Sequence, residues 1–348
     1  MRGFLLHTAA DVTNLGVVGP IFSDGTFEFI PINNEYGVKT KSYNRIPAKN
    51  KEFGKMLSDF LPSTLSDWAV HFDPNFDNFT YGQPVDNYPR SRVLENLKSD
   101  DVIFFVSSLA PYDNETYANK DTFLKHYQIR RKNKYVFGFF TVQGVARVTV
   151  LKSEPKLALP LLSIASFQEN GEQLIDLDSA KESLDTLERW EYIAREGGDY
   201  KLTTQCREIG RSGEEIASEL LDKWSNDEKD QATLLEKGYL NITTLSGSVT
   251  EEDVKLSQHY TRLRPLDWDQ FVLIKGNPQK SAILNKAVQL TNGFESFSFA
   301  LNNLGQTILN RKNDTLRGFR WINEYSVKLL IEVMNQSNSE LLDKLPFL

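Results

Sequence analysis

The stretch MRGFLLHTAADVTNLGVVGPIFSDGTFEFIPI, residues 1–32, opens the chain and predicts the centre of its fold. Its first apolar run, residues 3–10, is short and gives way to polar and glycine residues, which indicates a buried strand or a brief helix. Two further β-rich runs, residues 20–22 and 26–30, flank Ser23-Asp24-Gly25. Because Asp-Gly between such runs is a strong hairpin signal, we predict a β-hairpin there. We expect the rest of the chain to pack around this segment.

Two acidic residues of this segment are candidates for a site at the edge of the sheet. Asp11 follows the first apolar run, and a carboxylate at the end of a strand lies where a rigid scaffold commonly holds functional loops. The alternative for Asp11 is that its side chain only caps the following turn. Asp24 is likewise either a second site carboxylate or a turn residue that accepts a left-handed backbone.

Length and composition limit the classes of protein to which this chain can belong. A chain of 348 residues can bury a large core and has room for about two domains or one elaborated domain. No apolar run could span a bilayer and no secretory signal opens the chain, so we expect a cytoplasmic protein without a membrane partner. A single cysteine, Cys206, excludes a disulfide framework and a cysteine-rich zinc site. The four histidines are too scattered to form a sequence motif for a metal.

The charge of the chain limits how it could bind nucleic acid. A net charge of −7 does not favour such binding by the protein as a whole, so any contact with phosphates needs a local patch. Arg90 and Arg92, in a helix predicted over residues 89–97, are one candidate patch, and Arg130 and Arg131 belong to a second. Either patch can also be an ordinary solvated face, which is the usual role of a charge run.

Residues 110–134 combine aromatic and basic side chains. Tyr112 and Tyr127 are interleaved there with lysines and with Arg130 and Arg131. Because rings stack on nucleobases and cations contact phosphates, this segment predicts a surface for a single-stranded or flipped base. The alternative is a helix over about residues 115–127 whose rings belong to the core.

A histidine and an aspartate close a strand-like run at residues 68–74. Side chains two residues apart on a strand share a face, so His71 and Asp73 should stand within reach of one another. Such a pair can act as a general base and the group that orients it. The alternative is a buried histidine that a neighbouring acid satisfies, while Asp73 holds the turn before Pro74.

Apolar runs elsewhere predict further elements. Residues 102–106 and 135–142 predict two central strands of one sheet, and Gly138 inside the second indicates a bulge or a close backbone approach. We also predict a short amphipathic helix at 51–61, an extended linker at 156–164 and a helix at 281–288. The tail from about residue 297 predicts mostly helix, with an apolar stripe made of Trp321, Tyr325, Leu329, Leu330 and Val333.

Several short motifs follow the opening strand and Asp11 in a fixed order. They are GPIFSDG at 19–25 leading to IPI at 30–32, HFDP at 71–74, YGQ at 81–83, DVIFF at 101–105 and VFGFF at 136–140. Together they resemble the third nucleotide-modification-associated domain family over about residues 1–144. That family is linked to DNA base modification or phage conflict through its genomic company. The resemblance implies a nucleotide or nucleic-acid context and a site drawn from Asp11, Asp24, His71, Asp73, Tyr81 and Gln83.

We predict an α+β fold whose core is a mixed sheet or a small PUA-like barrel with flanking helices. The order of the runs at 100–105 and 136–140 resembles the strand spacing of PUA-type barrels, which is an analogy of fold alone. In this prediction the core covers residues 1–150, and residues 151–266 are a mostly helical insertion or second lobe. Residues 267–348 return with a strand, a turn and a helix and end in a helical tail.

Two classes of function follow from these residues. The first is an enzyme that acts on a nucleobase or nucleotide in DNA, with Asp11, Asp24, His71 and Asp73 as catalytic groups. Tyr81 and Gln83 would contact the base, and the segment 110–134 would hold the strand from which the base is flipped. The second is a non-catalytic reader of modified DNA or RNA, and a protein-interaction module in a defence operon is a third hypothesis.

The sequence leaves the cofactor and the oligomeric state open. No spacing demands a metal ion, so we assign no metal ligands and leave the cofactor unknown. A divalent ion such as magnesium or manganese, which prefers oxygen ligands, would need Asp11, Asp24, His71 and Asp73 to converge in the folded chain.

Overall fold

A curled mixed sheet that forms a half-barrel is the centre of the computed structural model. The structure describes residues 2–8, 15–34, 41–85, 89–171, 173–203, 238–263, 268–295, 298–316 and 318–338. The nine strands of the sheet are β1 (Gly3–His7), β2 (Gly19–Ile21), β5 (Thr80–Pro84), β6 (Val102–Pro111), β7 (Asn133–Leu151), β10 (Tyr239–Gly247), β11 (Trp268–Gly276), β12 (Ala282–Gln289) and β16 (Phe319–Ile322). Their main order is β16-β1-β6-β7-β11-β5, and the predicted mixed sheet is therefore confirmed.

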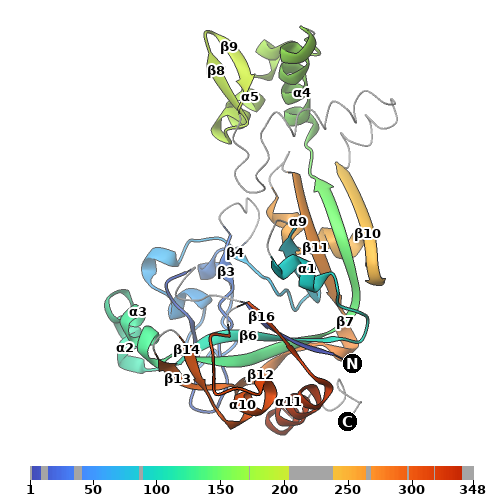
Figure 1. Ribbon diagram of the computed structural model, residues 1–348. Coiled ribbons are helices and arrows are strands. Elements are labelled where there is room, and N and C mark those ends of the chain that lie inside the picture. The colour runs from blue at the N-terminus through green and yellow to red at the C-terminus, as the bar shows by residue number, and fades with distance from the viewer. Residues whose placement is uncertain are drawn as a thin grey trace.

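Strand β7 connects the two parts of this sheet. It is 19 residues long and pairs with β6 and β12 along its first half and with β10 and β11 along its second half (Figure 1). Strands β1 and β2 both lie parallel to β6, whereas the partners of β7 are antiparallel to it. The apolar runs at 102–106 and 135–142 are thus neighbouring central strands, as the sequence predicts.

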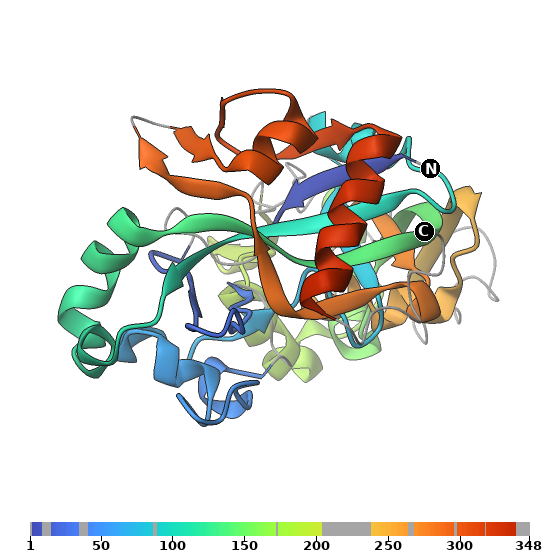
Figure 2. The same ribbon diagram turned by 90° about the horizontal axis from the view of Figure 1, so that it is seen from below.

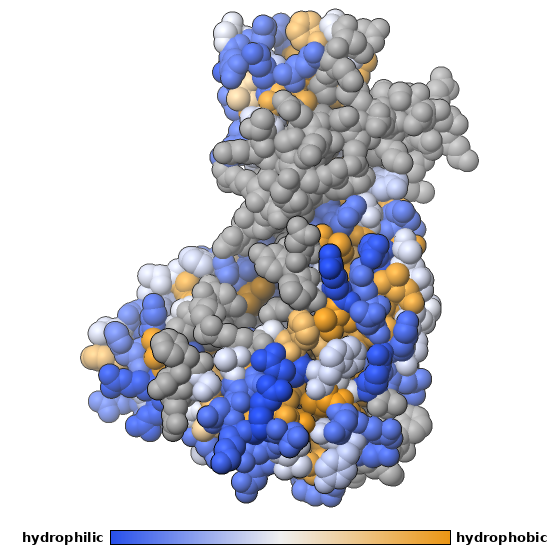
Figure 3. Space-filling view, in the orientation of Figure 1, coloured by the Kyte–Doolittle hydropathy of each residue, from blue (hydrophilic) through white to orange (hydrophobic). Residues whose placement is uncertain are grey.

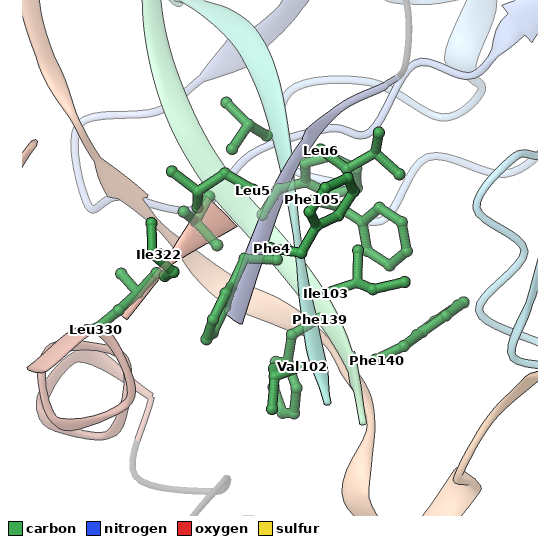
Figure 4. Close-up of a cluster of buried hydrophobic side chains, with 14 of the residues drawn as sticks. Phe4, Leu5, Leu6, Val102, Ile103, Phe105, Phe139, Phe140, Ile322 and Leu330 are labelled. Atoms are coloured by element: carbon green, nitrogen blue, oxygen red, sulfur yellow. The ribbon is translucent and has the colours of Figure 1, made fainter. Parts of the chain in front are cut away.

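The main hydrophobic core lies on both faces of β1, β6 and β7. Figure 4 shows Phe4, Leu5 and Leu6 of β1 packed among side chains of β6 and β7 such as Phe105 and Phe139. A strand that is buried on both faces has apolar residues at successive positions, which explains the continuous apolar runs in β1, β6 and β7. Strand β1, at the start of the opening stretch, therefore lies inside the fold, although it is only five residues long.

The glycine inside β7 has the role that its position in the strand indicates. A Cβ atom at Gly138 would lie 2.4 Å from the ring of Phe76, so only glycine lets that ring lie against the strand. The β6–β7 register shifts at the same place, between Phe105 and Val106, which marks a β-bulge. The sequence predicts a bulge or a close backbone approach at this glycine, and both are present, since the same Cβ atom would lie 3.0 Å from the main-chain oxygen of Ala282.

Helices from the C-terminal part of the chain pack against the sheet. Helix α11 (Glu324–Ser337) lies across the strands in Figure 2, with Val327, Leu330, Ile331 and Met334 buried. Helix α10 (Asn303–Leu309) packs against α11, next to a small sheet of β13 (Thr291–Glu295), β14 (Ser298–Leu301) and β15 (Asn313–Asp314). The other short elements near the sheet are α1 (Pro89–Leu94), α8 (Glu251–Leu256), α9 (Gln258–Arg262) and η5 (Pro278–Lys280).

A second group of buried side chains lies under the N-terminal loops. It joins residues between Leu15 and Val70 to Tyr117 and Leu124. Gln128 is fully buried there and bonds to both Val18 main-chain groups through its amide at 2.8 and 2.9 Å. The elements of this region are β3 (Ile32–Asn33), η1 (Tyr43–Arg45), η2 (Leu57–Phe60), η3 (Ser63–Leu65), β4 (Val70–His71), α2 (Asn114–Ala118) and α3 (Lys120–Arg131).

A separate lobe follows the end of β7. It contains α4 (Pro155–Asn170), η4 (Leu177–Ala180), α5 (Lys181–Arg189), β8 (Ile193–Glu196) and β9 (Asp199–Leu202), at the top of Figure 1. These elements share an apolar cluster of their own, which includes Leu151 of β7 and against which Tyr239 of β10 packs. None of the helices in the described ranges is both long and apolar enough to cross a bilayer.

Several element predictions are wrong at the local level. Residues 281–288 form strand β12 instead of a helix, because pairing with β7 overrides the helix-forming residues of this run. Residues 156–164 belong to helix α4, in which Pro155 occupies the first turn, where proline is tolerated, and the left-handed Gly171 ends the helix. The predicted helix at 51–61 shrinks to the 3-10 turn η2.

The C-terminal stripe is also only partly correct. Trp321 lies in strand β16 and is 40% exposed, and Tyr325 at the start of α11 is 67% exposed. Residues 298–322 contain three strands, so in the described part of the tail, up to residue 338, helix is confined to α10 and α11. Leu330 is buried, as the helical spacing predicts.

Candidate functional site

The turn after β4 carries the histidine and the aspartate of the HFDP motif. His71 is the last residue of β4 and faces Ile32 of β3 in the two-stranded ladder. It is only 2% exposed. The side chain of Asp73, two residues further, is 11% exposed. The two side chains converge, which agrees with the expectation that they lie within reach of one another.

A third polar side chain completes this group. His259, on helix α9, is 2% exposed, and its Nε2 lies 3.6 Å from Oδ2 of Asp73. One possible ligand atom from each of His71, Asp73 and His259 lies within 4.8 Å of those of the other two. The two imidazole rings meet edge to face, with centroids 5.4 Å apart and planes at 89°. We call these three residues the His–Asp–His cluster.

Strand β5 and strand β11 fix the geometry of the cluster. The backbone N–H of Gly82 in β5 donates a hydrogen bond to Oδ1 of Asp73 at 3.0 Å. A Cβ atom at position 82 would lie 2.0 Å from Cδ2 of His259, so the ring of His259 occupies the space that any other residue would fill. On its neighbouring strand, Phe271 stacks on the same ring at 5.1 Å and 21°. This explains the glycine in the motif YGQ.

An ion pair attaches the helices of this region to the sheet. Lys275 of β11 contacts Oδ1 of Asp253 in α8 at 2.6 Å, and Asp253 also accepts hydrogen bonds from the N-cap residue Thr250. Burial acts to raise the pKa of Asp253, but the hydrogen bonds from Lys275 and Thr250 outweigh it and hold this pKa below its ordinary value. Helix α9 follows α8 directly, so this pair helps to place His259.

The chemical character of the cluster follows from its members. Imidazole nitrogens and a carboxylate can exchange protons near neutral pH, and they can also coordinate a metal ion. Isolated polar groups are costly to bury, so a buried set that faces inward needs either mutual pairing or a ligand. Nδ1 of His259 is buried and has no hydrogen-bond partner among the residues that the structure describes.

His259 is the member of the cluster that the sequence prediction missed. It stands far from His71 in the chain and has no carboxylate or histidine at motif spacing next to it. Only the packing of α9 over Gly82 brings it to Asp73. The one sequence signal was indirect, since Gly82 in a strand indicates the close approach of another group.

The other residues of the implied family site lie elsewhere or are not described. The hydroxyl of Tyr81 donates to Oε1 of Gln83 at 3.1 Å, on the face of β5 opposite to that of Gly82. Asp24 accepts hydrogen bonds from the backbone and hydroxyl of Thr26, and the hydroxyl bond lowers its pKa, so it behaves as a turn residue. Asp11 lies outside the described residues.

The aromatic and basic segment divides between core and surface. Tyr112 stacks on Tyr117 at 4.7 Å and also contacts Phe22 and Phe53, and burial raises its pKa. This agrees with the alternative in which rings of the segment belong to the core.

The end of α3 stays at the surface. Arg130 and Arg131 are exposed, and the guanidinium of Arg131 lies 5.9 Å from the ring centre of the half-buried Tyr127. The surface around α2 and α3, at the lower left of Figure 3, is mostly hydrophilic with single apolar side chains. Arg92 of α1 is exposed as well, whereas the side chain of Arg90 lies outside the described part of the chain.

A pocket beside α9 is distinct from the cluster. It has a volume of about 230 Å³, and Lys152, Lys156, Trp190, Thr261 and Leu263 are among its lining residues. Thr261 is two positions after His259, and side chains with this spacing on a helix do not face the same way. The pocket therefore opens on another side of α9, between that helix and the α4–α5 lobe.

A comparison with protein-family models assigns the chain to a family. It matches the model described as nucleotide modification associated domain 3 over residues 2–237. The chain belongs to this family. The match to nucleotide modification associated domain 3 continues beyond residue 144, where the motifs of the sequence ended, and includes α4 and α5. It contains His71 and Asp73 but ends before His259. No curated protein and no solved structure matches the chain.

Proposed function

We propose that this protein is an enzyme of nucleotide modification whose reactive centre is the His–Asp–His cluster. The observation that carries the proposal is the meeting of His71, Asp73 and His259 in a nearly buried position within 4.8 Å. The family name, which links the chain to nucleotide modification, supports a nucleotide or nucleic acid as the substrate class.

Energetic reasoning supports a functional role for the cluster. Replacing buried polar groups by well-packed apolar ones often leaves a protein as stable or makes it more stable. Three titratable side chains in one nearly buried place are therefore a costly way to build a core, and such arrangements concentrate at functional sites. Imidazole beside carboxylate also gives a general base and its orienting group, which proton transfer to or from a nucleobase needs. Asp11 is a candidate fourth group in this proposal.

The experiment compares the nucleosides of cells that express the wild-type chain with those of cells that express variants. Total DNA, RNA and free nucleotides are digested and separated, and their masses are measured. We expect a new or depleted nucleoside mass with the wild-type chain and none with Asp73→Asn or His259→Gln. Glu95→Gln, which removes the exposed pair with Arg147, is the matched control and should behave like the wild type.

The stability of each variant decides how a loss is interpreted. If Asp73→Asn removes the activity while the melting temperature changes by only a few degrees, the cluster acts in the reaction. If both cluster variants retain the mass change, the reactive centre is elsewhere and the proposal is wrong.

A nucleic-acid reader is the second candidate. It rests on the exposed end of α3, where Arg131 lies against the ring of Tyr127 and Arg130 stands next to it. A ring with adjacent cations can stack on a base and contact a phosphate, so Tyr127→Ala and Arg131→Ala should weaken binding to single-stranded DNA or RNA. A gel-shift series over salt concentration tests this, and binding that Asp73→Asn leaves intact would favour the reader over the enzyme.

A further inference from the structure

We propose that His71, Asp73 and His259 bind one divalent transition-metal ion. This inference deepens the proposed function and rests on it only for the nucleotide substrate. Its basis is the donor set, two imidazoles and one carboxylate, which comes from the β4 turn and from α9. Two histidines and one carboxylate on one face of an ion are the ligand set of many mononuclear metal enzymes.

The distances fit an ion at the centre of the three residues. Ligand atoms that each bind an ion at about 2.0–2.2 Å lie roughly 3–4 Å from one another. The 3.6 Å between Nε2 of His259 and Oδ2 of Asp73 is in that range. All three ligand atoms lie within 4.8 Å of one another, which is less than about 1 Å above the upper end of that range. Small side-chain rotations can bring the atoms closer by this amount. We therefore expect the cluster to contract when the ion binds.

The surroundings prepare these ligands in the way that metal sites require. Gly82 N–H holds Oδ1 of Asp73, so the carboxylate presents Oδ2 toward His259. The ring of His259 is fixed between Phe271 and the backbone of Gly82, which leaves it little freedom to turn. Contacts of this kind, from residues that do not touch the metal themselves, orient its ligands. Removing them typically weakens metal binding by about 10–100-fold.

The donor set also selects the kind of metal. Magnesium and calcium prefer all-oxygen surroundings, so two imidazoles disfavour them. Imidazole with one carboxylate suits iron(II), manganese, cobalt, nickel or zinc. Three protein ligands leave further positions on such an ion for water or substrate. The sequence names no metal ligands, and the divalent ion it leaves open would need Asp11 and Asp24 beside His71 and Asp73. In the set proposed here, His259 takes the place of those two carboxylates.

Metal binding can be measured without any nucleotide. Tag-free protein is stripped with a chelator, desalted and titrated with cobalt(II), while the visible absorption and the heat of binding are recorded. We expect one ion per chain, new ligand-field bands, and a higher melting temperature in the presence of the metal. Asp73→Asn and His259→Gln should each weaken binding by at least about tenfold.

The control variants are His126→Gln and Asp24→Asn. Both remove a group of the same type from the exposed surface, so they should bind cobalt like the wild type. The proposal is overturned if the wild-type protein binds less than about half an equivalent, or if the cluster variants bind as tightly as the controls. The rise in melting temperature of the wild type needs no variant, so a misfolded Asp73→Asn protein would not block the test.

This test separates the inference from the proposed function. Cobalt bound by the cluster together with unchanged nucleoside masses would support the metal site and contradict the enzyme of nucleotide modification. A mass change that needs Asp73, in a protein that binds no metal, would contradict the metal site and favour acid–base chemistry by the imidazoles.

Discussion

The His–Asp–His cluster, of which the sequence predicts His71 and Asp73, and the aromatic segment at 110–134 fold in opposite ways. In the first, polar groups from distant parts of the chain are buried against each other. In the second, Tyr112 and Tyr117 join a hydrophobic cluster and the arginines stay outside. An aromatic ring is stabilised in the core by packing alone, whereas a buried imidazole or carboxylate needs a hydrogen-bond partner, an opposite charge or a ligand. Polar residues at a buried position are therefore the stronger sign of a site.

The largest expected effect tests the structural role of the aromatic segment. Tyr117 is 6% exposed and its hydroxyl accepts a hydrogen bond from the buried Gln128 at 3.0 Å. Tyr117→Ala should lower the free energy of unfolding by about 3–5 kcal/mol, because it leaves a cavity and removes the hydroxyl partner of the Gln128 amide. Urea unfolding measures this, with Tyr127→Ala as the control at less than about 1 kcal/mol. A small loss for Tyr117→Ala would mean that the segment is not part of the core.

A second prediction tests the packing of the His–Asp–His cluster. Gly82→Ala would place a methyl group 2.0 Å from Cδ2 of His259, so the ring must move away from Asp73. We expect a loss of about 1–3 kcal/mol in stability, which is typical of overpacking, and weaker cobalt binding. Gly197→Ala, in the turn between β8 and β9, has a left-handed backbone but no close neighbour, so it should destabilise the protein without changing metal binding. Unchanged cobalt affinity in Gly82→Ala would show that His259 is not a ligand.

Two residues of the His–Asp–His cluster, His71 and Asp73, were predictable from local sequence, and the third, His259, was not. The rule that side chains two apart in an extended segment share a face predicts that His71 and Asp73 lie close together, and this rule needs no tertiary structure. In the structure the two side chains do converge, although β4 ends at His71 and Asp73 lies in the turn after it. His259 reaches them only because α8 is attached to β11 through the pair of Asp253 with Lys275 and α9 follows it. Such long-range placement leaves no spacing pattern in the chain. The role of Gly82 becomes visible only when its neighbour is known.

The fold shows the same division. Strands β1, β6 and β7 were predictable because their apolar runs are continuous and buried on both faces. Strand β12, with the sequence AILNKAVQ, has residues that favour a helix, and its pairing with β7 and with Thr26 makes it a strand. Helix α4 was missed because its two prolines indicate extended chain, although Pro155 lies where a helix tolerates it.

A third prediction concerns the pH dependence of the attachment of α8. The pKa of Asp253 in the folded protein is below its ordinary value of 3.8, so the folded state binds fewer protons at this group than the unfolded state. Its contribution is therefore complete above about pH 5 and is lost as the pH falls through the folded-state pKa. Asp253→Asn should cost about 1–2 kcal/mol at pH 7, and the difference from the wild type should shrink below about pH 4.

Urea midpoints of the two proteins across this range measure the difference. Glu324→Gln at the exposed pair with Lys328 is the control, because a solvent-exposed pair contributes little at any pH. A gap between wild type and Asp253→Asn that stays constant down to pH 3 would contradict the assignment to this carboxylate. Weaker cobalt binding in Asp253→Asn at neutral pH would further link the attachment of α8 to the position of His259.

The smallest expected effect on stability lies at the exposed end of α3 and returns to the second region. Arg131→Ala removes a solvent-exposed cation over the ring of Tyr127, so the free energy of unfolding should change by less than about 0.5 kcal/mol. If this end of α3 contacts a phosphate, the same variant should lower the slope of log affinity against log salt by about one ion for single-stranded DNA. Lys125→Ala, exposed on the same helix, is the matched control. An unchanged slope in Arg131→Ala would leave the surface of this segment without a role in binding, and the buried cluster would then be the one region of the pair with chemistry.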